Sequence, residues 1–300
     1  MGGIKPGNPI KGVGLIIAAT MLFAVSDVLG KHLFMTYSVI LVMSVRYMVN
    51  TGLLTVVLAP TQGAVLWRTH RTVLVVLRGL CLAAASLSMG LALRLMPVGE
   101  TVAIIYLAPI AVMVVAWLLM GEVVTPVGWI GAIIGFAGVL LIVRPGTGLD
   151  PVGVMLCLIN AALATAYHLL TRILASTETM ISMLFHTSLA GMLVFLALLP
   201  FESVPAVPVW FDLAQMGLLG VLATGGHFLF TAAYREAPAS LLAPVNYMHL
   251  VWAGILGFLV FGHLPDGWTL VGMAMVASAG VAVALRAQFG HKAQVFEPVE

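Results

Sequence analysis

The chain has 300 residues, of which 62% are hydrophobic and only 8% charged, and its mean hydropathy is +1.14. A soluble domain of this size carries about a quarter charged residues, so an ordinary water-soluble protein is excluded. Thirteen Lys and Arg against eleven Asp and Glu leave a formal net charge of +2, too small for a nucleic-acid-binding protein. The composition therefore predicts a protein that crosses a membrane several times.

Ten apolar runs follow one another along the chain, separated by Gly, Pro and charged residues. A helix needs about 20 apolar residues to cross roughly 30 Å of hydrocarbon, and each run is near that length. The runs are apolar on every side, unlike the alternating strands of a barrel, which favours an all-α integral membrane bundle. They are Lys11–Phe34, Ser38–Ala59, Thr72–Arg94, Gly99–Leu119, Val127–Val143, Val152–Thr171, Met180–Leu199, Leu213–Tyr234, Ser240–Phe261 and Gly267–Leu285.

The positively charged residues predict the orientation of this bundle, because Lys and Arg beside short loops stay on the cytoplasmic side. Ten spans place both termini on one face, and that face carries most of the Lys and Arg. The opposite face has Lys31, Arg94 and Arg144, while Arg46 lies inside the second run. We therefore expect both termini in the cytoplasm, with residues 287–300 as a short disordered tail. The residues on the cytoplasmic face are Lys5, Lys11, Arg68, Arg71, Arg78, Arg172, Arg235, Arg286 and Lys292.

The chain also resembles itself at a shift of 141 residues, the separation of Pro97 and Pro238. This shift predicts two repeats of five runs each, residues 11–144 and 151–286. Because five is odd, the second repeat enters the membrane from the other side, so the two are inverted repeats. Inverted repeats permit alternating access, with the substrate near the midplane between them. Other aligned pairs are Tyr106 with Tyr247, Gly121 with Gly262, Gly131 with Gly272, Gly79 with Gly220, Arg94 with Arg235 and Lys31 with Arg172.

Polar side chains inside the runs predict a central cavity, because they are costly in hydrocarbon unless they face the bundle interior or water. In the eighth run Thr224, His227 and Thr231 recur at steps of three and four, and so share one helix face. Stripes of small residues also allow membrane helices to pack closely. For Gly79 and its neighbours, helix packing is therefore an alternative to cavity lining. The candidate cavity residues are Ser26, Asp27, Ser86, Tyr106, Asn160, Tyr167, His227, Asn246, Tyr247 and His249.

Charged residues are few enough to consider one by one. Asp27 and Lys31 are four residues apart in the first run, so either they pair or Lys31 reaches the interface while Asp27 faces the cavity. Arg46 is expected to contact a carbonyl or a lipid headgroup. Arg78 and Glu100 lie near the ends of their runs, and we expect both at the membrane interface.

Two prolines and several missing motifs complete the pattern. Pro109 and Pro244 interrupt the fourth and ninth runs, where each acts as a hinge or as a passive kink. The chain has no HExxH, GxSxG or Walker motif and no close cluster of His and Cys. We therefore expect no catalytic residue, no metal and no cofactor, and transport that is facilitated or coupled to an ion gradient.

Several features together resemble the drug/metabolite transporter superfamily and its EamA-type branch. They are the five-plus-five arrangement with short loops, Lys31 near the end of the first run, and Pro97 followed by Gly121 and Glu122. His263 replaces the acid in the second repeat's counterpart of this Gly-Glu. The likeness covers nearly the whole chain and is greatest to bacterial aromatic amino-acid exporters. It implies a basket-shaped exporter of the bacterial inner membrane.

The expected function is export of aromatic and other small neutral amino acids by alternating access. The candidate cavity has aromatic and aliphatic walls with at most one or two charges, which suits neutral or zwitterionic solutes. A multidrug or other small-metabolite exporter would share these features, and a non-transporting scaffold or an intramembrane enzyme is an alternative of another class. We expect a monomer whose partners are its small-molecule substrate and membrane lipid, and no nucleic acid.

Overall fold

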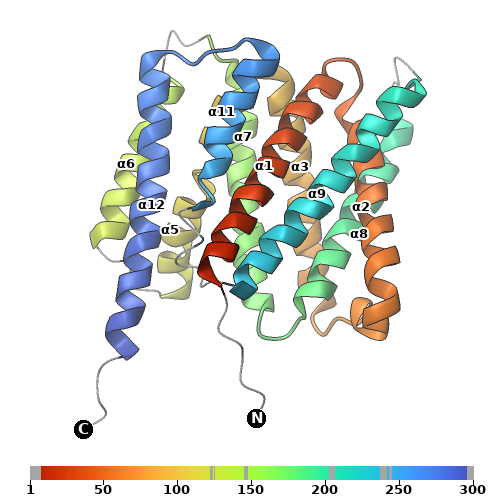
Figure 1. The fold of residues 1–300 in the computed structure, drawn as a ribbon, viewed down its shortest axis with the longest axis horizontal. Helices are drawn as coiled ribbons and strands as arrows, with labels where there is room; N and C mark the ends of the chain where they lie inside the picture. Colours follow the sequence, from red (N-terminus) through yellow and green to blue (C-terminus); the bar gives the residue numbers. More distant parts are fainter. Residues whose placement is uncertain are drawn as a thin grey trace.

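The computed structural model describes residues 8–121, 124, 126–144, 148–202, 207–236, 242 and 245–295. Within these ranges seven helical segments are long and apolar enough to cross a membrane, and three shorter apolar helices complete a set of ten. The protein is therefore an all-helical, multi-pass membrane protein of ten transmembrane helices, arranged as two inverted five-helix repeats (Figure 1).

The helices follow the ten predicted runs. The first repeat contains α1 (Pro9–Phe34), α2 (Val39–Gln62), a short 3-10 helix (Gly63–Leu66), α3 (Thr72–Leu95), α4 (Val98–Ile105), α5 (Ala108–Met120) and α6 (Pro126–Ile142). The second contains α7 (Pro151–Leu174), α8 (Met180–Leu198), a short 3-10 helix (Leu199–Phe201), α9 (Trp210–Glu236), α11 (Met248–Phe261) and α12 (Gly267–Val295). Helices α4 and α5 together form the fourth span.

Equivalent residues of the two repeats begin and end equivalent helices. The side chains of Ser38 and Thr179, which are 141 residues apart, cap the N-termini of α2 and α8 by accepting a hydrogen bond from a backbone N–H. Gly121 and Gly262 end α5 and α11 with φ of 68° and 69°. Only glycine adopts this left-handed conformation at no steric cost, so the shared glycines mark the same helix end in both repeats.

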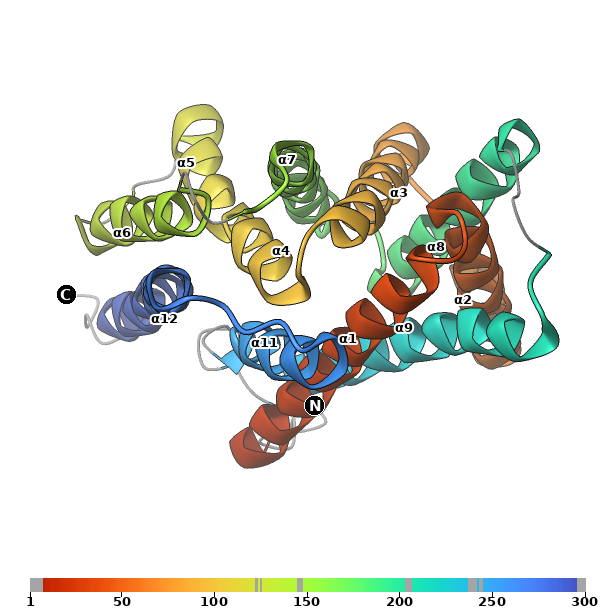
Figure 2. The same ribbon diagram turned by 90° about the horizontal axis from the view of Figure 1, so that it is seen from above.

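The helix contacts also repeat under exchange of the two halves. Helix α1 packs along α9, and its counterpart α7 packs along α3 (Figure 2). Helix α2 contacts α9 in the same way that α8 contacts α3, and α6 packs directly against α12. Each repeat therefore completes its packing with helices of the other repeat, as a pseudo-twofold relation between them requires.

The α6–α12 contact depends on two glycines that face each other. A Cβ on Gly272 would lie 2.6 Å from the carbonyl oxygen of Gly138, and a Cβ on Gly138 would lie 2.7 Å from that of Gly272. No side chain fits at either position, so the two backbones touch. Close approach through glycine is a common way for membrane helices to associate, because lipid provides no hydrophobic driving force between them.

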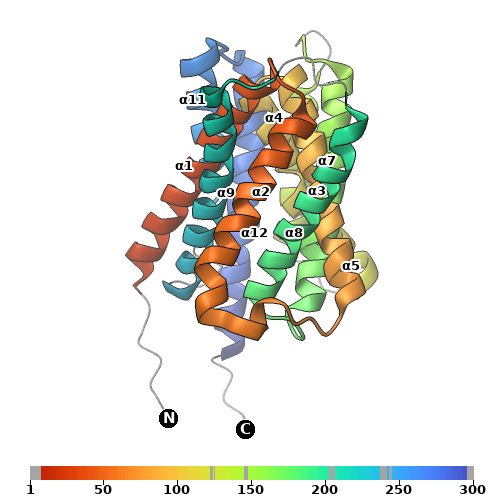
Figure 3. The ribbon, with the colours of Figure 1, turned by 90° about the vertical axis from the view of Figure 1, so that its right-hand side faces the viewer.

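The two ends of the chain lie at the same end of the molecule. Helix α1 begins there and α12 ends there (Figures 1 and 3). The disordered tail expected over residues 287–300 is wrong for its first part, because α12 continues as a helix to Val295. Residues such as Ala287, Gln288 and Lys292 have high helix propensity and do not stop the helix when it leaves the apolar run.

Candidate functional site

The fourth span is interrupted in the middle of the bundle. Helix α4 ends at Ile105, α5 begins at Ala108, and Tyr106 and Leu107 form the turn between them. Pro109 lies in the first turn of α5, where its missing N–H does no harm, so it starts a new helical segment. The equivalent turn in the second repeat contains Asn246 and Tyr247, directly before α11. Pro244 lies outside the described residues.

A cavity of about 370 Å³ adjoins both interruptions. Its wall includes aromatic and imidazole rings from α1, α7, α9 and α11 and polar groups between them, so it offers both stacking surfaces and hydrogen bonds. The lining residues are Phe23, Arg78, Tyr106, Tyr167, His168, Thr171, Met180, Met183, Leu184, His227, Phe230, Thr231, Asn246 and His249. Five of the sequence-predicted residues are among them: Tyr106, Tyr167, His227, Asn246 and His249.

Arg78 is the cationic centre of the cavity wall. It was expected at the membrane interface, but only 5% of it is exposed. Its Nε donates to Thr171 Oγ1 at 2.7 Å, its Nη2 donates to Tyr167 OH at 2.6 Å, and its Nη1 donates to the carbonyl of Met183 at 3.1 Å and to the hydroxyl of Thr187. These acceptors on α7 and α8 replace the water that a buried guanidinium loses.

The same network leaves one donor of Arg78 unused. A guanidinium carries five N–H groups, and four of them have partners in the described part of the chain. The guanidinium also stacks on the Tyr167 ring, 4.3 Å from its centroid. Arg78 therefore presents a fixed positive charge in the wall of the cavity, with one N–H that has no partner in the described part of the chain.

Tyr106 and His249 join the two repeats beside the cavity. The Tyr106 hydroxyl donates to the carbonyl of Asn246 at 2.9 Å, and its ring packs on Tyr247 with centroids 5.0 Å apart. His249 lies 6.0 Å from the Tyr106 ring, and its Nε2 is 3.0 Å from Oδ2 of Asp27 on α1. Tyr247 itself is buried behind this layer of rings.

The other five predicted residues lie outside the cavity wall, and two of them, Asp27 and Tyr247, make the contacts just described. Ser86 forms a 2.7 Å hydrogen bond with the hydroxyl of Tyr47 on α2. Asn160 is 6% exposed, and its amide donates to the carbonyl of Ala85 at 2.6 Å, which holds α7 against α3. Ser26 lines a separate small void. The polar groups of Ser86 and Asn160 are used between helices, because a buried polar group needs a partner wherever it lies.

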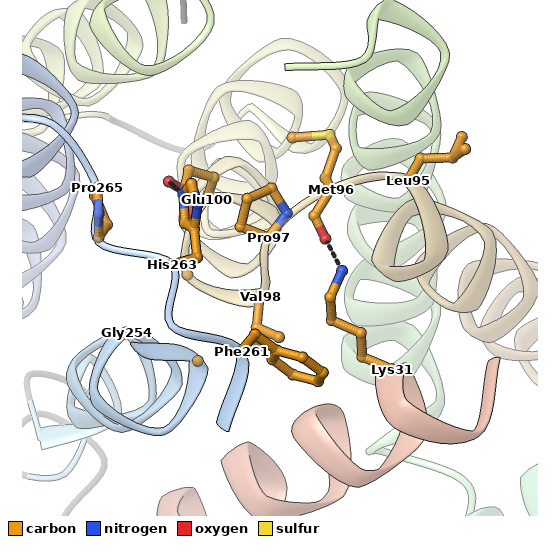
Figure 4. Close-up of a pocket in the computed structure, with 12 residues that line it drawn as sticks. Lys31, Leu95, Met96, Pro97, Val98, Glu100, Gly254, Phe261, His263 and Pro265 are labelled. Atoms are coloured by element: carbon orange, nitrogen blue, oxygen red, sulfur yellow. Dashed lines mark hydrogen bonds and ion pairs between the residues drawn. The ribbon is translucent and has the colours of Figure 1, made fainter. Parts of the chain in front are cut away.

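The Asp27–Lys31 pair considered from the sequence does not form. Asp27 bonds His249, whereas Lys31 Nζ donates at 2.6 Å to the carbonyls of Leu93 and Met96. Figure 4 shows the bond to Met96. The physical reason is Pro97, which has no N–H and leaves the carbonyl of Leu93 without its helical donor. The ammonium of Lys31 supplies that donor at the end of α3.

Lys31 also lines a second pocket, of about 240 Å³, at the end of the molecule opposite the termini. Glu100 was expected at the interface, but it is 3% exposed, and one of its oxygens is 2.8 Å from Nε2 of His263. Figure 4 shows Lys31, Glu100 and His263 around this pocket, contributed by α1, α4 and the segment after α11. The Glu100–His263 contact joins the two repeats at this end.

The most informative residue that the sequence interpretation placed wrongly is Arg78. A charged residue near the end of a run is usually interfacial, and only its neighbours from α7 and α8 make a buried position possible. Among the described residues, no group of three or more His, Cys, Asp or Glu is arranged to hold a metal ion.

Comparison with known proteins identifies the family. The model of the EamA-like transporter family matches residues 10–144 and again residues 151–285. The chain belongs to the EamA-like transporter family. Together with the helices described above, this makes it a multi-pass membrane transporter, and its family relatives are transporters rather than enzymes.

Similar EamA-like proteins include transporters of different solutes. The S-adenosylmethionine uptake transporter of Rickettsia bellii is 26% identical over 279 residues, covering 89% of this chain and 91% of that one. The riboflavin transporter of Brucella anthropi is 29% identical over 236 residues, covering 76% and 82%. The riboflavin transporter of Rhizobium johnstonii is 28% identical over 198 residues, covering 64% and 63%. These names do not support the expected amino-acid specificity.

A solved crystal structure has the same fold. It superposes with a TM-score of 0.63 and covers 93% of this chain and 97% of that one, at 19% sequence identity. At this identity the likeness concerns the fold alone.

Proposed function

We propose that this EamA-like protein transports a small metabolite that carries a planar aromatic or heteroaromatic ring. The observation that carries the proposal is the cavity beside the two interrupted spans, whose wall combines several rings with the buried guanidinium of Arg78. At about 370 Å³ the cavity falls within the usual range of roughly 300–1,000 Å³ for small-molecule sites.

The rings of the wall suit a flat solute. Phe23 packs edge-on against His227 at 5.1 Å and against His249 at 6.2 Å, so part of the wall is a continuous aromatic surface. Aromatic rings bind other rings by offset or edge-to-face packing, so they favour the binding of a planar ligand. The spare donor of Arg78 suits an acceptor such as a carboxylate, carbonyl or ring nitrogen. The cavity therefore favours a ring with at least one polar acceptor.

The relatives support this class more than they support amino-acid export. S-adenosylmethionine contains an adenine and riboflavin contains a fused three-ring system, so the solutes named for the relatives are both heteroaromatic. A small-metabolite transporter thus fits better than an amino-acid exporter. Tryptophan also carries an aromatic ring, and it belongs in the test as the amino-acid representative.

The mechanism we propose is alternating access by exchange of the conformations of two repeats, residues 11–144 and 151–286. The cavity extends to Met180 and Thr171 near the α7–α8 connection, at the end where α1 begins and α12 ends. The opposite end is held by the Lys31 and Glu100–His263 contacts. With both termini in the cytoplasm of a bacterial inner membrane, as the Lys and Arg distribution favours, this conformation faces inward.

The test is a counterflow assay with the purified protein in lipid vesicles. Vesicles are loaded with unlabelled solute, and entry of labelled S-adenosylmethionine, riboflavin, tryptophan or leucine is followed. We expect exchange of at least one ring-bearing solute, recovered chemically unmodified, and none of leucine. Exchange of leucine alone, or of no solute, would contradict the proposal. Recovery of a modified solute would instead indicate an intramembrane enzyme.

A further inference from the structure

One face of α1 touches three separate spaces in succession. Phe23, Asp27 and Lys31 are spaced four residues apart, so they lie on the same helix face. Phe23 lines the cavity, Asp27 lines a void of about 20 Å³, and Lys31 lines the outer pocket of about 240 Å³. No lining residue is shared between any two of the three spaces. This face of α1 marks a line from the cavity to the opposite end of the molecule.

The Asp27–His249 contact lies between the first two spaces. His249 belongs to the wall of the cavity and Asp27 to the wall of the void, and 3.0 Å separates His249 Nε2 from Asp27 Oδ2. Both side chains are mostly buried, with 15% of His249 and 19% of Asp27 exposed. The Asp27–His249 hydrogen bond therefore joins the wall of the cavity to the wall of the void.

The space beside this contact is large enough for a water, and several charged or titratable groups surround the pair. The void of about 20 Å³ exceeds the roughly 10–15 Å³ that one water needs. Arg46 on α2 lines the same void, and its buried Nε has no hydrogen-bond partner among the described residues. The other titratable or charged groups that face the pair are Lys31 one turn along α1, Tyr106 and Tyr247 at the interrupted spans, and His227 on α9 across the Phe23 ring.

We propose that Asp27 and His249 are the proton-binding site that couples transport to a proton gradient, which rests on the proposed transport function. A hydronium ion in the cavity gives a proton to the unprotonated ring nitrogen of neutral His249 and becomes water, so the ring becomes an imidazolium. The Nε2–H bond then breaks, an O–H bond forms at Oδ2 of Asp27, and both side chains become neutral. The proton leaves Asp27 to water on the outer side when that side opens, and the steps run in reverse for the opposite direction.

The opening movement supplies the reason for this transfer. Asp27 belongs to the first repeat and His249 to the second, so in the proposed exchange of conformations the two side chains move apart. Separating a carboxylate from an imidazolium in a low-dielectric interior leaves two buried unpaired charges, which costs several kcal/mol. Proton transfer before separation removes both charges. One proton thereby crosses with the change of conformation, and net coupling requires that the return step run without it.

The experiment compares two readouts on the same vesicles, counterflow and net accumulation driven by an imposed pH difference. Counterflow needs no net proton movement, so it reports solute binding and exchange alone. For one proton per solute, each unit of pH difference supports up to about tenfold accumulation. We expect wild-type vesicles to accumulate solute in one orientation of the gradient and not in the other, with matching movement of protons reported by a trapped pH dye.

The variants are Asp27→Asn and His249→Gln, which keep polar side chains of similar size. We expect Asp27→Asn, which changes no residue of the cavity wall, to retain counterflow and to lose gradient-driven accumulation. His249→Gln removes a ring of the cavity wall, so it should raise the half-saturating solute concentration in counterflow and also lose gradient-driven accumulation. Glu100→Gln and His263→Gln are the matched controls, because they remove a similar carboxylate–imidazole contact of 2.8 Å between the repeats that touches neither the cavity nor the void. Because Glu100–His263 helps to hold that end closed, the controls should change the rate of transport, but the ratio of solute accumulated at equilibrium should equal that of the wild type.

Several outcomes would overturn the proposal. Counterflow by the wild type without any gradient-driven accumulation would exclude proton coupling and would leave the proposed transport function standing. Accumulation at the wild-type ratio in both variants would exclude this pair as the coupling site. Loss of counterflow in both would make them solute-binding residues. If Asp27→Asn does not fold, gradient-driven accumulation by His249→Gln, measured at a solute concentration that saturates its counterflow, decides the question.

Discussion

Replacing Arg78 by lysine tests whether the buried guanidinium binds solute. Arg78→Lys keeps the positive charge but exchanges a planar group with five donors for an ammonium with three. Arg78 now makes four hydrogen bonds to α7 and α8 and has one N–H to spare. An ammonium has no donor left for a solute even if it satisfies three of those acceptors.

The magnitude follows from that lost donor. A hydrogen bond from a charged group contributes about 1.5–3 kcal/mol. Because about 1.4 kcal/mol is a factor of ten, loss of one such bond weakens solute binding by about 10- to 150-fold. We therefore expect the half-saturating solute concentration in counterflow to rise by this factor while the maximal exchange rate changes less.

The assay is counterflow over a range of solute concentrations, with Arg144→Lys as the control. Arg144 is hydrogen-bonded to both oxygens of Asp266 at 2.8 Å just after the C-terminal end of α6, away from the cavity. It therefore reports the effect of an Arg-to-Lys change that touches no cavity wall. An unchanged half-saturating concentration in Arg78→Lys, or a rise no larger than that of the control, would refute the assignment of Arg78 to solute binding.

Three further predictions concern stability and binding. The hydrogen bond from Arg144 lowers the pKa of Asp266 from 3.8 to about 2, so this bond should stabilise the protein fully above about pH 4 and lose its effect as the pH falls through about 2. The melting temperature should show this loss in the wild type and not in Asp266→Asn. Gly272→Ala should lower the melting temperature even though alanine is the better helix former. Gly52→Ala, whose new Cβ meets open space, should not lower it. Equal effects of the two changes would contradict the close contact between Gly272 and Gly138. Asn160→Ala should lower the melting temperature and leave the half-saturating solute concentration unchanged. His227→Ala should raise the half-saturating solute concentration. The reverse pattern would contradict the assignment of these two residues inside and outside the cavity wall.

The spans and their symmetry are predictable from the sequence because lipid imposes them. A helix that crosses hydrocarbon must be apolar over its whole length, and this signal is local. The shift of 141 residues likewise aligns Gly121 with Gly262, and the structure places both at equivalent helix ends. These properties depend on short stretches of chain and not on which helices become neighbours.

The partners of individual polar groups could not be predicted in the same way. Asn160 and His227 are both polar residues in apolar helices, yet one bonds the backbone of α3 and the other lines the cavity. Asp27 and Lys31 have the spacing of a pair, but a carbonyl left free by Pro97 binds the lysine instead. Such outcomes depend on helices far apart in the sequence.

The crossed packing of the repeats has a consequence for synthesis of the protein. Helix α1 lies against α9 and α3 lies against α7, so the first half of the chain has no neighbours for these surfaces when it leaves the ribosome. The helices of the first half therefore complete their packing only after those of the second half have been inserted into the membrane. We expect neither half to reach its folded structure alone. A gene divided between the halves would yield working protein only in a cell that makes both pieces.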